Sequence, residues 1–479
     1  MAFASDTIPM TRHAFRVGAA AIMALAACSP DSLVKTDPPS AIIDGRSANT
    51  PVAATALYNG VLNAFAATMA GSGNAQAADD YIVSSGTMTD EFISGPGSSS
   101  PVDTRTNFFA FSTGSESGQS GLYLRLQLAR VGAYQARVAL QNYGADGSTP
   151  RIGRMYAMEA YSILLLAEYF CNGIPLSQTP VSGNPVYEAG ETTTQLLTKA
   201  VALFDTAITL SADSSEYQNL AKVGKGRALL DLGDFAGAGA AVAGVPLTFV
   251  SKLELKAAAN FAVGGVAYSL TNQLAPPTGF QAAFLVMDNE GGKGLKWSGD
   301  VRTPAVTQSF SGTNLWVPKY LTQSDPIRLA DGLEASLIRA EVAFNTGTGT
   351  AWLDTLNALR ANCTTLSGCA PIAGVTAAGL PALADSSTQA GRLRLLMSER
   401  AHWLFATGHR QGDLRRMLRA PYGAPPFNFT STDVYPSGAY VNSGYTGAIT
   451  SYGPDVVAIP ARSEQQYNSK YTGCFDQNP

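Results

Sequence analysis

Residues 399–416 hold the side chains best suited to chemistry, in a chain of 479 residues of which only 14% are charged. Glu399, His409 and Asp413 could act as general acid and base, because carboxylates and imidazoles exchange protons with reacting groups. The same run could instead be structural, since Arg410 can bind Glu399 or Asp413 through two parallel hydrogen bonds. No nucleophile or set of metal ligands lies nearby in the sequence, so we favour the structural role.

A helix, a sharp corner and a second helix must position these groups. Residues 393–405 carry apolar side chains at helical spacing along one face. Gly408 is expected to end this helix, because glycine adopts the left-handed conformation at no steric cost. The next two residues form the corner, and we expect a new helical turn to open at Asp413.

This run resembles the C-terminal signature of the SusD/RagB family of outer-membrane nutrient-binding lipoproteins. The matching positions, in chain order, are Glu399-Arg400, Phe405, Gly408-His409-Arg410 and Asp413-Leu414-Arg415-Arg416. Gln411-Gly412 stand where the family usually has an aromatic pair. The resemblance implies a structural signature without catalytic residues, formed by Glu399, Gly408, His409, Arg410 and Asp413.

Composition excludes several classes of protein. The 32 Lys and Arg residues nearly balance the 36 Asp and Glu residues, which gives a net charge of −4. A nucleic-acid-binding protein needs a basic face, so that class is disfavoured. Since 46% of the residues are hydrophobic, the chain is not an acidic disordered protein either. The 47 glycines and 26 prolines indicate long loops.

The N-terminus reads as an export signal rather than a folded element. Arg12 and Arg16 precede a short apolar stretch, residues 17–27, which is too short to cross a bilayer. Leu25-Ala26-Ala27-Cys28 resembles the bacterial lipobox, in which the cysteine becomes the lipid-bearing first residue. We therefore expect a signal peptide over 1–27, a lipid anchor on Cys28 and a flexible tether over 28–49. An ordinary signal with a coincidental cysteine is the alternative, and either Met1 or Met10 could be the start.

Four further cysteines remain for the exported chain, where disulfides are allowed. Cys363 and Cys369 are close in sequence and are the favoured pair, but the pairing among Cys171, Cys363, Cys369 and Cys474 stays open. A zinc site is disfavoured, because the exported chain keeps only two histidines and has no Cys-x-x-Cys.

The rest of the chain predicts a mainly α fold. Apolar periodicity or capping residues predict helices over the ranges Ala53–Ala70, Leu122–Tyr143, Arg154–Phe170, Gln195–Leu210 after the capping Thr192-Thr193-Thr194, Leu220–Val242, Ala335–Asn345 and Trp352–Ala361. Residues 154–170 are apolar almost all round, so this helix should be buried between others. The last ranges form helix pairs of the tetratricopeptide type, and the resemblance implies a SusD-like scaffold of such pairs.

We expect one SusD-like domain over residues 50–479. Its helical scaffold would comprise 50–245 and 326–420. Residues 246–325 have few helical runs and would form a loop-rich lobe with short strands, and 421–479 would be an irregular C-terminal segment.

Residues suited to a sugar ligand are found in the long segment 71–118 and in the lobe. Sugar sites use flat aromatic rings for stacking and polar groups for the hydroxyls. The aromatic candidates could equally pack inward. The candidates are Asp90, Arg105, Phe108, Phe109, Trp297, Arg302 and Tyr320.

The resemblance implies a binding protein without enzymatic activity, metal or cofactor. It would sit on the outer membrane, face the exterior and bind a nutrient, which we expect to be an oligosaccharide. Its partner would be a TonB-dependent transporter of the SusC-like kind. The alternatives are a peptide-binding or assembly scaffold that uses the helix pairs and, less favoured, a secreted glycoside hydrolase.

Overall fold

The computed structural model of the protein describes residues 49–70, 81–89, 91, 93–94, 119–180, 184–255, 284–285, 300–303, 306–307, 315–316, 325–347, 349–366, 369, 380–435 and 462–476. The expected signal peptide, the expected lipid anchor Cys28 and the expected tether up to residue 48 lie outside these ranges.

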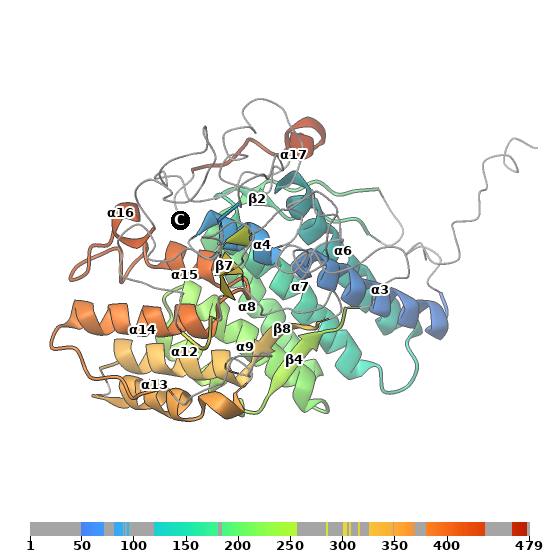
Figure 1. Ribbon diagram of the computed structural model, residues 1–479. Coiled ribbons are helices and arrows are strands. Elements are labelled where there is room, and N and C mark those ends of the chain that lie inside the picture. Colours follow the sequence, from blue (N-terminus) through green and yellow to red (C-terminus); the bar gives the residue numbers. More distant parts are fainter. Residues whose placement is uncertain are drawn as a thin grey trace, which may run out of the picture.

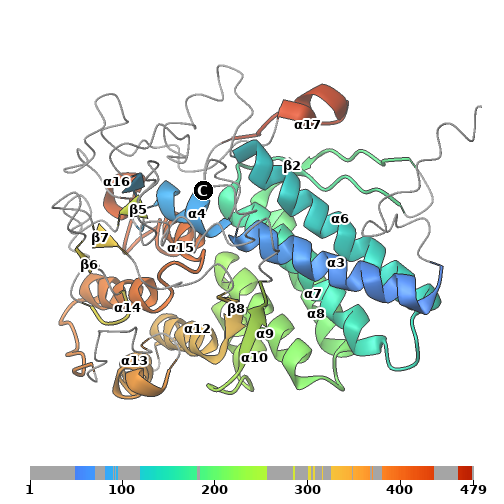
Figure 2. The ribbon, with the colours of Figure 1, turned by 45° about the vertical axis from the view of Figure 1, so that its right-hand side comes forward.

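Two groups of helices make the scaffold, and they confirm the predicted mainly α fold. The first group comprises α3 (Pro51–Ala70), α6 (Gln119–Tyr143), α7 (Thr149–Tyr169), α8 (Thr193–Leu210), α9 (Ser215–Asp231) and α10 (Phe235–Val242). The second comprises α12 (Gly332–Asn345), α13 (Ala351–Ala361), α14 (Gln389–Trp403) and α15 (Arg410–Arg416). Short helices are α4 (Tyr81–Met88), η4 (Cys363–Thr365), α16 (Ser431–Val434) and α17 (Arg462–Tyr467). Figures 1 and 2 show α12, α13 and α14 together at one end and α3, α6 and α7 at the other.

Helix α7 is the buried centre of the first group, as its all-round apolar sequence predicts. It packs against α6, α8 and α9, and nearly all of its second half is buried. It begins at Thr149, five residues before the predicted start at Arg154, because Pro150 fits the first helical turn, where its missing N–H is not needed.

Side-chain caps set the starts of several helices. Thr192 and Gln195 form a capping box at α8, in which the Gln195 N–H donates to Thr192 Oγ1 at 3.2 Å and the Thr192 N–H donates to Gln195 Oε1 at 2.8 Å. Asp234 caps α10 directly after Gly233, whose φ of 76° makes the turn from α9. The predicted helix pair over 220–242 is therefore confirmed.

Four short antiparallel strand pairs accompany the helices in the described part of the chain. They are β1 (Ile93–Ser94) with β5 (Phe284–Leu285), β2 (Ile174–Pro175) with β3 (Gly190–Glu191), β4 (Val250–Leu253) with β8 (Ile327–Asp331), and β6 (Val306–Thr307) with β7 (Leu315–Trp316). Strand β8 runs directly into α12, so the β4–β8 pair joins the two helix groups.

The scaffold has two clusters of buried apolar side chains, and α12 belongs to both. Ala335 and Ile338 face the cluster under α3 and α6 to α10. Leu333 and Leu337 face the cluster formed with α13 and α14. One helix is thus buried on both sides and binds the two groups into one unit.

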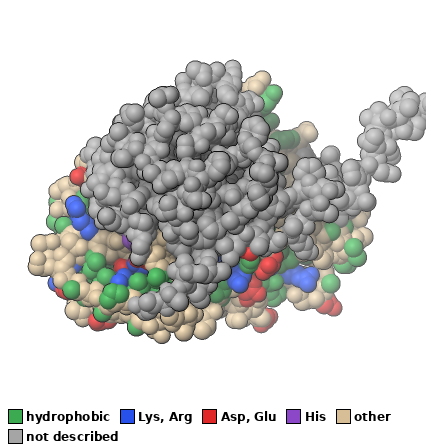
Figure 3. Space-filling model, in the orientation of Figure 1, with side chains coloured by type: hydrophobic (Ala, Val, Ile, Leu, Met, Phe, Trp, Pro, Cys, Tyr) green, Lys and Arg blue, Asp and Glu red, His purple; other side chains and the backbone are tan. Residues whose placement is uncertain are grey.

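Among the helices in the described ranges, none combines the length and the apolar character needed to cross a membrane. On the face in Figure 3, acidic and basic side chains of the described part lie interspersed rather than in a broad patch of one sign.

Two disulfides are present. Cys363–Cys369 closes the short loop after α13, which confirms the favoured pairing. Cys171–Cys474 joins the end of α7 to the C-terminal segment across a sequence separation of 303. Hydrogen bonds reinforce this tie: Asn172 Nδ2 donates to Asp476 Oδ1 at 2.7 Å, and the Phe475 N–H donates to the Asn172 carbonyl at 2.9 Å.

Removing the long-range disulfide should destabilise the protein more than removing the local one. A disulfide lowers the entropy of the unfolded chain, and this effect grows with the logarithm of the number of residues in the loop that the disulfide closes. Sequence separations of 303 and 6 therefore predict a difference of about 3 kcal/mol in the free energy of unfolding. The double variants Cys171→Ser/Cys474→Ser and Cys363→Ser/Cys369→Ser are compared by chemical denaturation. Equal losses of unfolding free energy in the two variants would show that the Cys171–Cys474 disulfide does not restrain the unfolded chain.

Candidate functional site

The corner at residues 404–409 is built from two left-handed residues. Helix α14 ends at Trp403, five residues before the predicted end at Gly408, because Ala406 has a φ of 55° and Gly408 a φ of 79°. The left-handed Gly408 confirms the sequence prediction. Helix α15 begins at Arg410, earlier than the expected start at Asp413. It lies against α4, α7 and α9.

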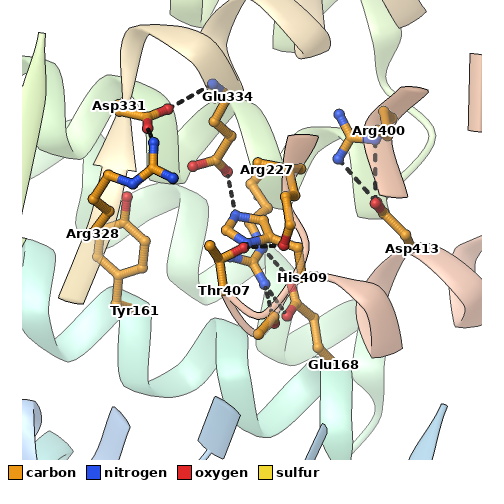
Figure 4. A network of polar contacts seen from close by, with 12 residues as sticks. Tyr161, Glu168, Arg227, Arg328, Asp331, Glu334, Arg400, Thr407, His409 and Asp413 are labelled. Carbon is orange, nitrogen blue, oxygen red and sulfur yellow. Dashed lines mark hydrogen bonds and ion pairs between the residues drawn. The ribbon is translucent and has the colours of Figure 1, made fainter. Parts of the chain in front are cut away.

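His409 is buried at the centre of the corner (Figure 4). Its Nδ1 lies 2.8 Å from Thr407 Oγ1, and its Nε2 lies 3.1 Å from Glu334 Oε1 on α12. Thr407 donates its own hydroxyl to the Leu404 carbonyl, so the imidazole must donate to Thr407.

The pocket beside His409 is too small for a sugar. Arg328, Asp331, Glu334 and Thr407 supply its polar lining, and the volume open to the centre of a water molecule is about 10 Å³. That is room for about one water molecule. The corner is therefore an interior joint, not an open cleft.

Glu168 on α7 forms the first of three buried carboxylate centres around the corner. Arg227 on α9 binds it through two hydrogen bonds of 2.6 Å, and Tyr81 donates to it at 3.1 Å. The same guanidinium donates to the Gly408 carbonyl at 3.1 Å. Gly412 packs directly on this carboxylate, since an added Cβ would lie 2.7 Å from Glu168 Cδ. The departure from the usual aromatic pair thus makes room for Glu168.

Glu399 on α14 is the second centre. Arg302 donates to it at 2.6 and 3.2 Å, Arg360 on α13 donates at 2.6 Å, and the Trp403 indole N–H donates at 3.1 Å. All of these side chains are buried. Arg302 also binds Asp300, with hydrogen bonds of 2.9 and 2.7 Å.

Asp413 and Glu341 together form the third centre. Arg400 on α14 donates to Asp413 at 2.9 Å, and Arg416 donates to it at 2.8 Å. Arg416 also binds Glu341 on α12 through both of its terminal nitrogens. The Tyr422 hydroxyl donates to Glu341 at 2.7 Å. One guanidinium therefore joins α12 and α15.

The predicted partner of Arg410 was wrong. Glu399 is bound by Arg302 and Arg360, and Asp413 by Arg400 and Arg416, instead of by Arg410. The reason is geometric. Packing brings Arg302 and Arg360 to Glu399 from other parts of the chain, and Arg400 and Arg416 already bind Asp413. Arg410 is itself buried.

The pKa values of the cluster follow from these contacts. Burial opposes ionisation of Asp300, but the hydrogen bonds and charge of Arg302 outweigh it and lower the pKa of Asp300 to about 2. Burial likewise opposes ionisation of Asp413, and the charges of Arg400 and Arg416 hold its pKa far below the usual range. Burial, followed by the charge of Arg419, lowers the pKa of Arg415 to about 10. Arg415 instead donates to the Ala167 and Phe170 carbonyls at the end of α7.

The buried carboxylates of the corner are occupied by arginines. Glu168, Glu399 and Asp413 each accept hydrogen bonds from at least one guanidinium group. Within the described ranges, no group of His, Cys, Asp and Glu side chains is arranged to hold a metal ion.

The structure describes one of the seven ligand candidates. Arg302 is 3% exposed and occupied by Asp300 and Glu399, which ties it to the Glu399 centre. Its assignment as a ligand contact stays a prediction. The others lie outside the described residues: Asp90, Arg105, Phe108, Phe109, Trp297 and Tyr320.

Sequence reasoning missed Glu168 and Arg227. A usable signal existed, because Glu168 interrupts the apolar run of α7, and a carboxylate buried in an apolar helix needs a charged partner.

The sequence matches no family model and no curated protein. Solved structures nevertheless share its fold. A SusD-like carbohydrate binding protein from Bacteroides vulgatus is 15% identical, with a TM-score of 0.62 over 90% of this chain and 98% of the other. A laminarin binding SusD-like protein is 15% identical, with a TM-score of 0.59 over 89% and 99%. Surface glycan-binding protein A from Bacteroides uniformis is 14% identical, with a TM-score of 0.59 over 89% and 99%. The chain therefore has the SusD-like fold that its signature predicts.

Replacing Glu399 by Gln should cost about 3–5 kcal/mol of unfolding free energy, because it leaves Arg360 buried without a counter-charge and leaves Arg302 with Asp300 alone. Glu191→Gln is the control, since its partner Lys199 is 54% exposed and such surface pairs contribute less than about 1 kcal/mol. Urea denaturation of both variants at neutral pH measures the difference. Similar small losses would mean that the Glu399 centre is solvated and not a structural joint.

Proposed function

We propose that this protein binds oligosaccharides without chemically changing them. The observation that carries the proposal is the likeness of nearly the whole chain to solved proteins described as carbohydrate-, laminarin- and glycan-binding. Because fold alone does not define function, the chemistry of the described site is a second support.

The described site favours binding over hydrolysis. A glycoside hydrolase needs two carboxyl groups that flank the bond to be cleaved in an open cleft. In the signature run the buried carboxylates are held by arginines, and the adjacent pocket has room for about one water molecule. The aromatic candidates Phe108, Phe109, Trp297 and Tyr320 have the ring faces on which sugars stack.

Binding of the chain from residue 29 onward to glycan and peptide arrays, followed by calorimetry, tests this proposal. We expect an oligosaccharide ligand, no release of shorter glycans, and an affinity loss of about 1–3 kcal/mol in Trp297→Ala if that ring stacks on the sugar. Tyr143→Ala is the matched control, because this aromatic ring is 43% exposed at the end of α6 in the scaffold. Tight peptide binding without sugar binding would favour an assembly scaffold, and glycan cleavage would favour a hydrolase.

We further propose that the protein is a lipid-anchored protein of the outer membrane that faces the exterior and delivers its ligand to a TonB-dependent, SusC-like transporter. The support is the N-terminal sequence: a basic start, a short apolar stretch and Leu25-Ala26-Ala27-Cys28. A second support is the resemblance of the signature run to nutrient-binding lipoproteins. A tethered protein stays near its transporter, which raises its effective concentration there.

Cys28→Ser should release the protein from the membrane fraction, because the thiol that would carry the lipid is gone. Membrane fractionation and mass spectrometry of the mature N-terminus measure the outcome, and affinity capture from detergent-solubilised outer membrane identifies the partner. Cys363→Ser/Cys369→Ser serves as the control, since it removes thiols far from the N-terminus. A Cys28→Ser protein that stays membrane-bound, or a capture without a transporter, would contradict the respective half of the proposal.

A further inference from the structure

Two buried polar joints connect α14 and the corner to the short strands outside the helical scaffold. Glu91, two residues before β1, accepts a 2.9 Å hydrogen bond from the backbone N–H of Ala406. Arg302, four residues before β6, binds Glu399 on α14. Each joint links residues far apart in sequence, and Glu91 and Ala406 are at most 1% exposed.

The Glu91 joint meets the corner at a strained residue. Ala406 is not glycine, yet its φ is 55°, a conformation that costs on the order of 1–3 kcal/mol. Its N–H is fully buried, and a buried N–H without an acceptor would be costly. A side-chain oxygen of Glu91 satisfies this N–H. The strained backbone and the Glu91 carboxylate therefore depend on each other.

Both joints hold one connected set of strands. β1 pairs with β5, β5 lies against β7, and β7 pairs with β6. We call β1, β5, β6 and β7 the lobe strands. In the sequence, three ligand candidates flank these strands: Asp90 directly precedes Glu91, Trp297 lies between β5 and Arg302, and Tyr320 follows β7.

We propose that Glu91 is a positioning residue that seats the lobe strands on the strained Ala406 corner and thereby sets the affinity for the ligand. The inference rests on the proposed glycan binding. Arg302 anchors the far side of the same strands, so loss of Glu91 frees one side and leaves the helical scaffold intact. A ligand site whose supporting residues are loosened loses affinity even when every contacting side chain is present.

Three substitutions of Glu91 separate the reach of its side chain from its charge. Glu91→Ala removes the acceptor, Glu91→Asp keeps the charge but is one methylene too short, and Glu91→Gln keeps both the length and an acceptor oxygen. We expect Glu91→Ala and Glu91→Asp to weaken glycan binding on the order of tenfold, which corresponds to about 1.4 kcal/mol of binding free energy. We expect Glu91→Gln to retain most of the affinity.

Hydrogen exchange followed by mass spectrometry measures directly, without a ligand, whether the Glu91–Ala406 hydrogen bond protects the corner and β1. In Glu91→Ala and Glu91→Asp, exchange should rise at Ala406 and in β1, while α7 and α8 keep their protection. Leu197→Ala in α8 is the matched control: it opens a cavity in the first apolar cluster and lowers Tm, but it should leave both the corner exchange and the affinity unchanged.

Unchanged exchange at Ala406 in Glu91→Ala and Glu91→Asp would overturn the seating role. Faster exchange with unchanged glycan affinity would overturn the positioning role. A similar affinity loss in Leu197→Ala would show that lower stability alone explains the weaker binding of the Glu91 variants, and it would also count against the inference. A wild-type chain that binds no glycan would instead defeat the proposed function, and the exchange result would still decide whether Glu91 seats the strands.

Discussion

The pairing of buried guanidinium groups with buried carboxylates is the constraint on which the rest of this structure depends. Removing a charge from water costs several kcal/mol, and that cost is recovered only when an oppositely charged partner is present with good geometry. Glu168, Glu399 and Glu341 each meet an arginine from another helix or from the lobe. These pairs therefore oppose any packing of α7, α9, α12, α14 and α15 that would leave one of the charges buried alone.

Polar contacts hold the corner in addition to the apolar packing of its buried Leu404 and Phe405 side chains. Arg227 connects Glu168 on α7 to the Gly408 carbonyl, and His409 connects the corner to Glu334 on α12. The apolar clusters on either side of α12 supply most of the burial, whereas the ion pairs select the geometry. Apolar packing tolerates small shifts in position, but a two-bond guanidinium–carboxylate contact does not.

Solved proteins of about 15% identity share this fold. Many apolar side chains can fill a helical core if volume and pattern are preserved. A corner that needs left-handed residues, a buried imidazole and matched charges is far less tolerant of change.

The sequence by itself determined most of the helices and the left-handed Gly408, and it favoured the Cys363–Cys369 pair, because periodicity, caps and turns depend on neighbouring residues. Only the tertiary structure decided that Glu399 binds Arg302 and Arg360, and that Cys171 reaches Cys474. The prediction that Arg410 binds Glu399 or Asp413 was wrong for the same reason. Periodicity specifies which face of a helix is buried but not which residue of a distant element it meets, and these contacts are made only when the elements pack.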